Sequence, residues 1–214
     1  MTTMVKNRRD ALEEFYDELD FWFLLGTRGE TTDSSNRWVG YAGGLLETIR
    51  DDHVEELTLP DYASSSQRGD FTIANFNKKL EGKFYYGGQE KILLCGVDFH
   101  TAFSIMLNEK TNNLPTIVDR WGVKGQRFDS SNGGVIHVVP SDTMSLNGMS
   151  NYAVLFDPDT FQYGHLQNMD ITVIDQHVNP NVHEKTGEVY GVITTKRTNP
   201  DANWLFVMDA NDED

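Results

Sequence analysis

A long amphipathic stretch near the start of the chain constrains the fold more than any other feature of the sequence. Its apolar residues recur at steps of three and four, the spacing of one helix face; they are Leu12, Phe15, Leu19 and Trp22, widened by Tyr16 and Phe23. The opposite face carries Arg8, Arg9, Glu13, Glu14, Asp17 and Glu18. The pattern predicts a helix over residues 4–25, ended by Gly26. At about 22 residues it would be roughly 30 Å long, which is large for this chain.

Shorter helices and then strands are predicted behind this helix. Short helices are expected at 45–50, 72–86 and 99–109. Strands are expected at 92–95, 116–128, 134–139, 152–156, 171–175, 189–195 and 204–208, with turns at 129–133, 157–158 and 199–201. Polar loops are expected at Thr27–Asn36, Asp61–Asp70 and Gln176–Gly187. Helices come first and long strands last, an order that favours the α+β class.

The charge of the chain is strongly negative. The 18 basic residues stand against 33 acidic ones, which gives a formal net charge of −15. Such a surface repels phosphate backbones, and the most basic stretch, Lys6–Arg9, is short. We therefore expect no direct binding to nucleic acid.

The single cysteine and the lengths of the apolar runs indicate the compartment in which the chain is made. Cys95 lies in the apolar run Ile92–Cys95 and is expected to be a buried core thiol. It cannot form an intramolecular disulfide, and no cysteine pair for metal binding exists. The start of the chain lacks the pattern of a signal peptide, and no apolar run approaches the roughly 20 residues that span a bilayer. We expect a soluble chain made in a reducing compartment, without membrane contact.

No recognisable catalytic or metal-binding motif emerges from the sequence. The histidines His53, His100, His137 and His165 are isolated, and each is expected to be packed or on the surface. Gly40–Gly44 lacks the Lys-Ser/Thr of a phosphate-binding loop, so Gly43 and Gly44 are interpreted as a sharp turn. Asp157-Pro-Asp159 resembles half of a calcium loop, but a plain turn is favoured. The sequence predicts no catalytic, cofactor-binding or metal-binding residues, no cofactor, and no enzymatic activity.

Several segments in fixed order resemble one protein family. Arg9–Gly26, with its aromatic and aliphatic run before the glycine, resembles the long spine helix of tailed-phage major capsid proteins. Gly43–Ile49 resembles the Gly-Gly-Leu-x-x-x-Ile element that follows in a subgroup of that family. Further matching segments are Phe84–Gly96, Val135–Ser141, Tyr152–Asp157 and Gly187–Ile193 with Asn199-Pro200. The ordered set covers almost the whole chain, from Arg9 to Met208.

The resemblance implies a Hong Kong 97-type capsid fold. A peripheral lobe with the spine helix packed on long strands would comprise residues 1–60 and 165–214, and an axial lobe with a mixed sheet would comprise 61–164. The implied function is that of a viral structural protein, whose pentamers and hexamers tile an icosahedral phage head. Implied partners are other capsid subunits, with portal, scaffold or decoration proteins, in a virion assembled in the host cytoplasm. The three polar loops are the candidate contact surfaces.

The start of the chain departs from the pattern of that family. There, an N-terminal arm and an extended loop precede the spine helix and supply much of the contact between neighbouring subunits. Here the predicted helix begins almost at Met1, so both are expected to be missing. Assembly into a complete shell would then depend on other contacts.

Two other classes of function stay open as alternatives. A metal-dependent hydrolase would use Asp175, His177, His183 and Glu184, which cluster around one predicted loop. A small ligand- or glycan-binding module would instead use Trp38, Tyr41 and Trp121 as stacking platforms.

Overall fold

The computed structural model divides the chain into two compact units. It describes residues 3–32, 36, 38–41, 43–58, 71–108, 117–120, 123–165, 172–178, 185–190 and 193–209. One unit, here called the helix unit, comprises residues 1–47 and 162–196, and the other, the sheet unit, comprises 48–161 and 197–214. These units differ from the predicted lobes at residues 48–60 and 197–214, which fall in the sheet unit, and at 162–164, which fall in the helix unit. The identification of the units with the peripheral and axial lobes stays a prediction.

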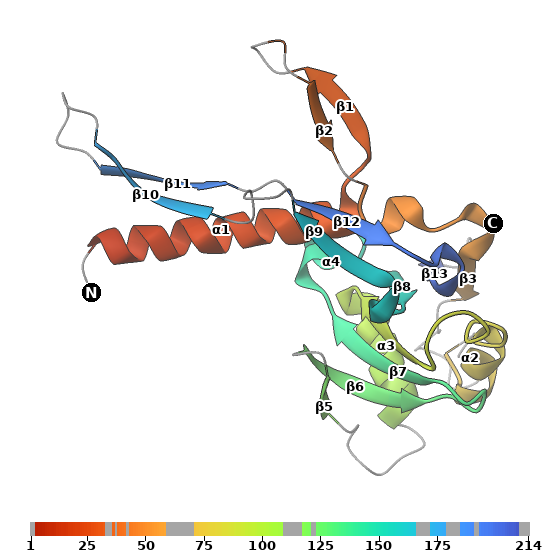
Figure 1. Cartoon of the computed structure of the whole chain (residues 1–214). Helices are drawn as coiled ribbons and strands as arrows, with labels where there is room; N and C mark the ends of the chain where they lie inside the picture. Colours follow the sequence, from red (N-terminus) through yellow and green to blue (C-terminus); the bar gives the residue numbers. More distant parts are fainter. Residues whose placement is uncertain are drawn as a thin grey trace, which may run out of the picture. The chain divides into compact units, whose positions relative to one another are not determined.

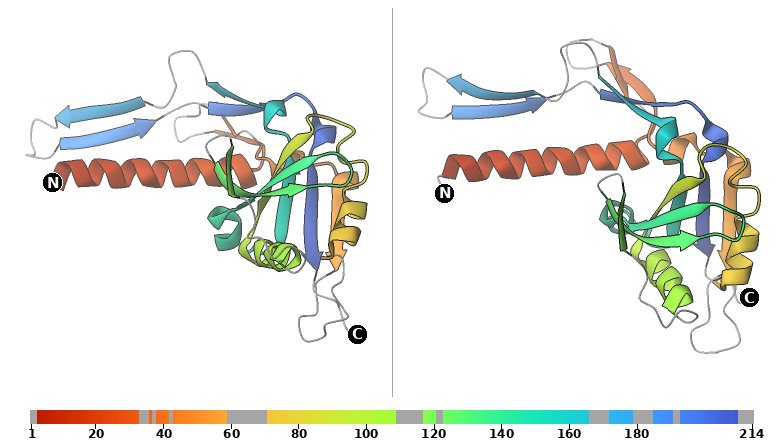
Figure 2. Two further views of the ribbon diagram at one scale, coloured as in Figure 1. Left: turned by 90° about the horizontal axis from the view of Figure 1, so that it is seen from below. Right: turned by 60° about the horizontal axis from the view of Figure 1, so that its bottom comes forward.

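The helix unit contains one long helix and several two-stranded ribbons (Figure 1). The helix α1 runs over Thr3–Leu25, which confirms the predicted amphipathic helix. The ribbons are antiparallel pairs of β1 (Gly29–Thr32) with β2 (Trp38–Tyr41) and of β10 (Thr172–Val178) with β11 (Lys185–Tyr190), and β9 (Phe161–His165) pairs with β12 (Ile193–Arg197). Within this unit β11 runs beside α1 (Figure 2).

The sheet unit is built on a seven-stranded mixed sheet. Its strand order is β3 (Val54–Thr58), β13 (Trp204–Asp209), β8 (Tyr152–Phe156), β4 (Glu90–Cys95), β7 (Val135–Pro140), β6 (Val123–Asp129) and β5 (Ile117–Arg120). The pairs β3–β13 and β4–β7 are parallel, and the other neighbours are antiparallel. The helices are α2 (Ile73–Lys79), α3 (Val97–Asn108) and α4 (Asp142–Leu146), with short 3-10 turns at Asp51–His53, Pro158–Thr160 and Pro200–Ala202.

The core of the sheet unit is aromatic. Phe76 of α2 has no exposed surface, and its ring lies 5.2 Å from that of Phe103, 5.8 Å from Phe128 and 6.0 Å from Phe206. The two closer rings are arranged edge to face, a geometry that adds to the stabilisation from burial alone. The core thus packs the helices α2 and α3 against β6 and β13, which lie toward opposite edges of the sheet.

Several predicted elements differ from the observed ones. The predicted helix 72–86 is wrong in length, because α2 ends at Lys79 and a turn follows, in which Gly82 has φ +81°. The predicted loop Thr27–Asn36 contains β1, and the predicted strand 116–128 is two antiparallel strands, β5 and β6. The predicted helix 45–50 is only the 3-10 turn Leu46–Thr48. The predicted loop Asp61–Asp70 lies outside the described residues.

Candidate functional site

Polar side chains gather in the sheet unit beside the three places where the chain passes between the units. We call the set formed by Arg50, His53, Lys91, Asp157, Asp201 and Asn203 the polar clasp. Its residues come from the segments that follow residue 47, precede residue 162 and follow residue 196, together with the central strand β4. The clasp therefore joins segments that are far apart in the sequence.

Lys91 is the innermost member of the clasp. It lies on β4 with no exposed surface, and its ammonium group donates to the carbonyl oxygens of Tyr86 at 3.0 Å and Ala202 at 2.6 Å. Burial lowers the pKa of Lys91 to about 8, while the negative charge of Asp157 acts in the opposite direction. A substrate cannot reach an amine without exposed surface, so this geometry suits a structural clamp.

Asp157 ties the end of β8 to two further segments. Its buried carboxylate accepts from the backbone N–H groups of Gly88 at 2.6 Å and Asp159 at 3.0 Å. Its own N–H donates to the side-chain oxygen of Asn203 at 3.3 Å. The predicted turn at 157–158 is confirmed as a 3-10 turn that this carboxylate caps.

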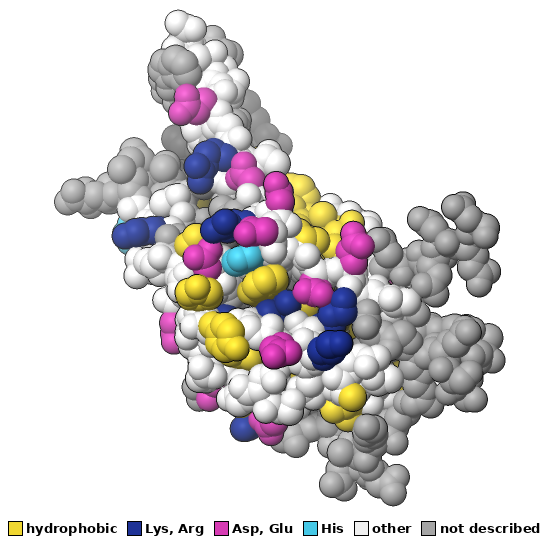
Figure 3. Space-filling view, turned by 90° about the vertical axis from the view of Figure 1, so that its right-hand side faces the viewer, with side chains coloured by type: hydrophobic (Ala, Val, Ile, Leu, Met, Phe, Trp, Pro, Cys, Tyr) yellow, Lys and Arg dark blue, Asp and Glu magenta, His cyan; other side chains and the backbone are white. Residues whose placement is uncertain are grey.

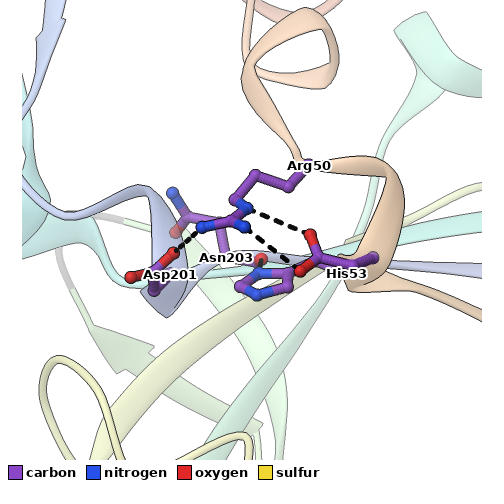
Figure 4. A network of polar contacts seen from close by, with 5 residues as sticks. Arg50, His53, Asp201 and Asn203 are labelled. Carbon is purple, nitrogen blue, oxygen red and sulfur yellow. Dashed lines mark hydrogen bonds and ion pairs between the residues drawn. The ribbon is translucent and has the colours of Figure 1, made fainter.

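The outer part of the clasp is an ion-pair network on the surface (Figure 4). The Arg50 guanidinium binds Asp52 through Nε at 3.0 Å and Nη2 at 3.2 Å, and it binds Asp201 through Nη1 at 3.0 Å. Beneath it, His53 Nδ1 lies 3.0 Å from the Asn203 carbonyl oxygen, and the His53 ring stacks on Trp204 at 4.2 Å. The predicted turn 199–201 is confirmed, and the clasp connects it to the segment after residue 47.

A second polar feature of the sheet unit is a cleft of about 450 Å³ beside β3 and α2. It is lined by Glu55, Asn75, Lys78, Lys79, Glu81 and Lys83, and we call it the lysine-lined cleft. Figure 3 shows a face of the molecule on which basic side chains lie among acidic and hydrophobic ones.

Glu55 holds two of the three lysines of this cleft. Its carboxylate lies 3.0 Å from the Lys79 ammonium and 2.9 Å from that of Lys83. Burial works to raise the pKa of Glu55, but the hydrogen bonds and charges of Lys83 and Lys79 outweigh it and hold the pKa below its usual value. Lys83 Nζ also lies 3.9 Å from the centre of the Trp204 ring, within the range of a cation–π contact.

The residues of the two alternative functions are only partly within the described structure. Asp175 and His177 lie on β10, with a register shift between them, whereas His183 and Glu184 lie outside the described residues. Trp38 and Tyr41 lie on β2, and Trp121 lies outside the described part. Among the residues that the structure describes, no group of three or more His, Cys, Asp or Glu side chains could hold a metal ion. The absence of catalytic and metal-binding residues stays a prediction.

The predictions for the cysteine and the isolated histidines are confirmed. Cys95 has no exposed surface, and burial raises the pKa of its thiol to about 12. His53 and His137 are buried, burial lowers the pKa of the half-buried His100, and His165 is exposed. No helix in the described part of the chain is both long enough and apolar enough to cross a membrane.

The clasp and the lysine-lined cleft were not predicted from the sequence. Lys91 is a charge directly before the apolar run Ile92–Cys95, which was the available signal for a buried polar contact. Nothing local indicates that Asn203 and Asp201 lie beside His53 and Arg50, because about 150 residues separate them.

Comparison with known proteins identifies the family of the chain. The family model of the SU10 major capsid protein matches residues 2–208. The search of curated proteins gave no match. Among solved structures, the chain is similar to that of the holo-SrpI encapsulin complex from Synechococcus elongatus PCC 7942, with a TM-score of 0.60 and 12% identity over 98% of this chain and 67% of the encapsulin chain. It also matches a virus-like particle from Pyrococcus furiosus, with a TM-score of 0.43 and 13% identity over 76% of this chain and 58% of that one.

These findings agree with the sequence analysis on both fold and family. The encapsulin similarity shows the fold alone, and it confirms the predicted α+β, Hong Kong 97-type architecture. The family match extends over nearly the whole chain, from residue 2 to residue 208. The chain therefore belongs to the SU10 major capsid protein family, as a major capsid subunit.

Proposed function

We propose that this capsid subunit acts without catalysis, by associating with copies of itself into pentamers and hexamers of an icosahedral phage head. In this proposal the helix unit is the peripheral lobe and the sheet unit is the axial lobe. The subunit would be part of the virion and would assemble in the host cytoplasm, where portal, scaffold or decoration proteins are further partners.

The observation that carries the proposal is the set of open strand edges in the helix unit. In the described part of the chain, β1–β2, β10–β11 and β9–β12 are each two-stranded, so every one of these strands has an unpaired edge. A two-stranded ribbon is marginally stable alone in water, and an unpaired edge is a template for pairing with another chain. Contact with neighbouring copies would supply the missing support.

Strands of two of these ribbons overlap with two of the predicted contact loops. The strand β1 lies within Thr27–Asn36, and the end of β10 and the start of β11 lie within Gln176–Gly187. Exposed backbone edges of this kind bind extended segments of a partner by β-augmentation. They are the positions at which the proposal places contacts between copies.

The test is the mass of the full chain by light scattering over a concentration series, with negative-stain electron microscopy of the same samples. We expect the mass to rise with concentration and the images to show rings of five or six subunits or closed shells. A strict monomer up to the solubility limit would overturn the proposed self-association.

A further inference from the structure

The lysine-lined cleft is a local excess of positive charge on a strongly negative chain. It brings three lysines together against two glutamates, whereas the whole chain carries −15. Lys78 is exposed, and none of the described residues forms an ion pair with it. Two identical subunits of this charge repel each other, so a contact between them gains most where a basic site of one copy meets an acidic site of the other.

The matching acidic site lies on α1. Six exposed carboxylates on α1 are spaced three, four and seven residues apart and so share one helix face; they are Asp10, Glu13, Glu14, Asp17, Glu18 and Asp20. We call them the acidic face. Arg9 pairs with Glu13 at 2.8 Å, and no lysine or arginine occurs between residues 10 and 27. Most of this face therefore has no nearby cation along the helix.

Like charges oppose each other within each of the two sites. Partial burial of its carboxyl group raises the pKa of Asp20, and the neighbouring charge of Asp17 raises it further. Burial likewise lowers the pKa of Lys83, and the Lys79 charge adds to this, which together outweigh the effect of Glu55. A group of opposite charge from a second copy would offset the like-charge part of these shifts.

Exposed aromatic side chains accompany the charges at both sites. Phe21 is 37% exposed and continues the acidic face one turn beyond Asp17. In the sheet unit, Tyr85 is 82% exposed and follows the cleft residue Lys83 by two positions in the sequence. Aromatic residues at the centre and charged residues at the rim are the usual composition of a protein–protein contact.

We propose that the lysine-lined cleft of one copy binds the acidic face of α1 of a second copy. The contact joins two different surfaces, so it is head to tail and can close into a ring. This inference rests on the proposed self-association and names a pair of surfaces that would carry it.

The experiment reverses one exposed charge on each surface of the full chain. Lys78→Glu makes the cleft acidic, and Asp17→Lys makes the helix face less acidic. For each variant alone, we expect the concentration at which half of the subunits are assembled to rise by about tenfold or more. The reason is that a like-charge pair replaces a pair of opposite charges at every contact. An equimolar mixture of the two variants should regain assembly of hexamers, since alternating copies match reversed helix to reversed cleft and native helix to native cleft, whereas a five-membered ring cannot alternate and should stay impaired.

Matched controls separate this contact from a general effect of net charge. Arg127→Glu and Asp129→Lys make the same charge changes at an exposed ion pair on β6, where the side chains are 45% and 67% exposed. These variants should assemble like the unaltered chain, alone and mixed. Rescue by mixing also excludes misfolding, because a misfolded subunit cannot be restored by adding a second variant.

The outcomes distinguish this inference from the proposed function. If the unaltered chain assembles and Lys78→Glu and Asp17→Lys assemble equally well, the proposed contact is wrong and self-association stands. If each variant is impaired but the mixture is not rescued, the two surfaces do not meet between copies, and the proposal is again wrong. If the unaltered chain stays monomeric, the proposed self-association fails, and this contact fails with it.

Discussion

The two units of this chain differ in how they bury their apolar side chains. The sheet unit buries Phe76, Leu93 and Phe103 completely, on both helices and strands. In the helix unit, the only buried hydrophobic side chains among those described are Leu24 and Leu45, near the end of α1 and just after β2. One unit thus carries its own core, while the other is a long helix with narrow ribbons. We expect the sheet unit to contribute most of the folding stability of the chain. The helix unit should be stabilised by contacts with neighbouring copies.

The sharpest test of this comparison is amide hydrogen exchange on the full chain. Amides of β4 and β8, which lie inside the seven-stranded sheet, should exchange only on global unfolding. Amides of β1 and β2 should exchange orders of magnitude faster in the dilute subunit, because local opening of a lone ribbon costs little. Assembly should then slow exchange in β1 and β2, and equal protection of both units in the dilute chain would contradict the comparison.

Removal of a core aromatic ring should give the largest loss of stability. Phe76→Ala should lower the free energy of unfolding by about 3–5 kcal/mol, because the cavity lies among three other rings. Phe21→Ala, at a half-exposed position of α1, is the control and should cost about 0.5 kcal/mol or less. Urea denaturation measures both, and similar losses for the two variants would show that the units do not differ in this way.

The buried lysine of the clasp should make stability depend on pH in the alkaline range. The pKa of Lys91 is about 8 in the folded chain, against an ordinary value of 10.5. Between these values the unfolded chain binds more protons, so the contribution of Lys91 to stability rises with pH and is lost as pH falls from 10.5 to 8. Over this full pH range the contribution of Lys91 to the free energy of unfolding changes by about 3 kcal/mol.

Comparison with Lys91→Met isolates this effect. Other groups titrate in the same range, among them Cys95, but they do so in both proteins and cancel in the difference. Denaturation of the two proteins at pH 7.5 and pH 10 should show the unaltered chain gaining stability relative to the variant. A difference that stays constant with pH would mean that Lys91 titrates normally.

Two glycines with the same backbone conformation should respond differently to alanine. Gly87 has φ +80° and Gly133 has φ +86°, a region that costs a non-glycine residue about 1–2 kcal/mol. At Gly133 an added methyl group would meet no atom within 4 Å, whereas at Gly87 it would meet Asp157 and Ala202 of the clasp region. Gly87→Ala should therefore lower the thermal midpoint more than Gly133→Ala, and the reverse order would argue against a tightly packed clasp.

The exposed part of the clasp should contribute least to the stability of the fold. Arg50→Ala should leave the thermal midpoint within the error of measurement at about 0.15 M salt, because exposed ion pairs are screened. His53→Ala removes a buried ring stacked on Trp204 and should cost about 0.5–1.5 kcal/mol. A large drop of the thermal midpoint in Arg50→Ala would mean that the surface ion pairs of the clasp, and not its buried residues, contribute most to stability.

The elements that the sequence predicts correctly are those with a strong local pattern. The α1 stripe, the apolar run of β4 and the turns at 157–158 and 199–201 are set by residues close together in the chain. The end of α2 was misplaced, because apolar residues continue at helical spacing to Phe84 although the backbone turns from Leu80 onward. The strand β3 was missed, since its Val-Glu-Glu-Leu-Thr sequence is not typical of a strand.

The sequence by itself determined the long amphipathic helix, the α+β order of elements, the acidic surface and the family resemblance. Each of these depends on residue types, or on spacings of a few positions, that are visible without a fold. The tertiary structure alone decided that β3 pairs in parallel with β13, and that Lys91, Asp157 and Asn203 meet in one clasp. Such contacts join segments up to about 150 residues apart, and they form because burial of the aromatic core brings those segments together, for which no local pattern exists.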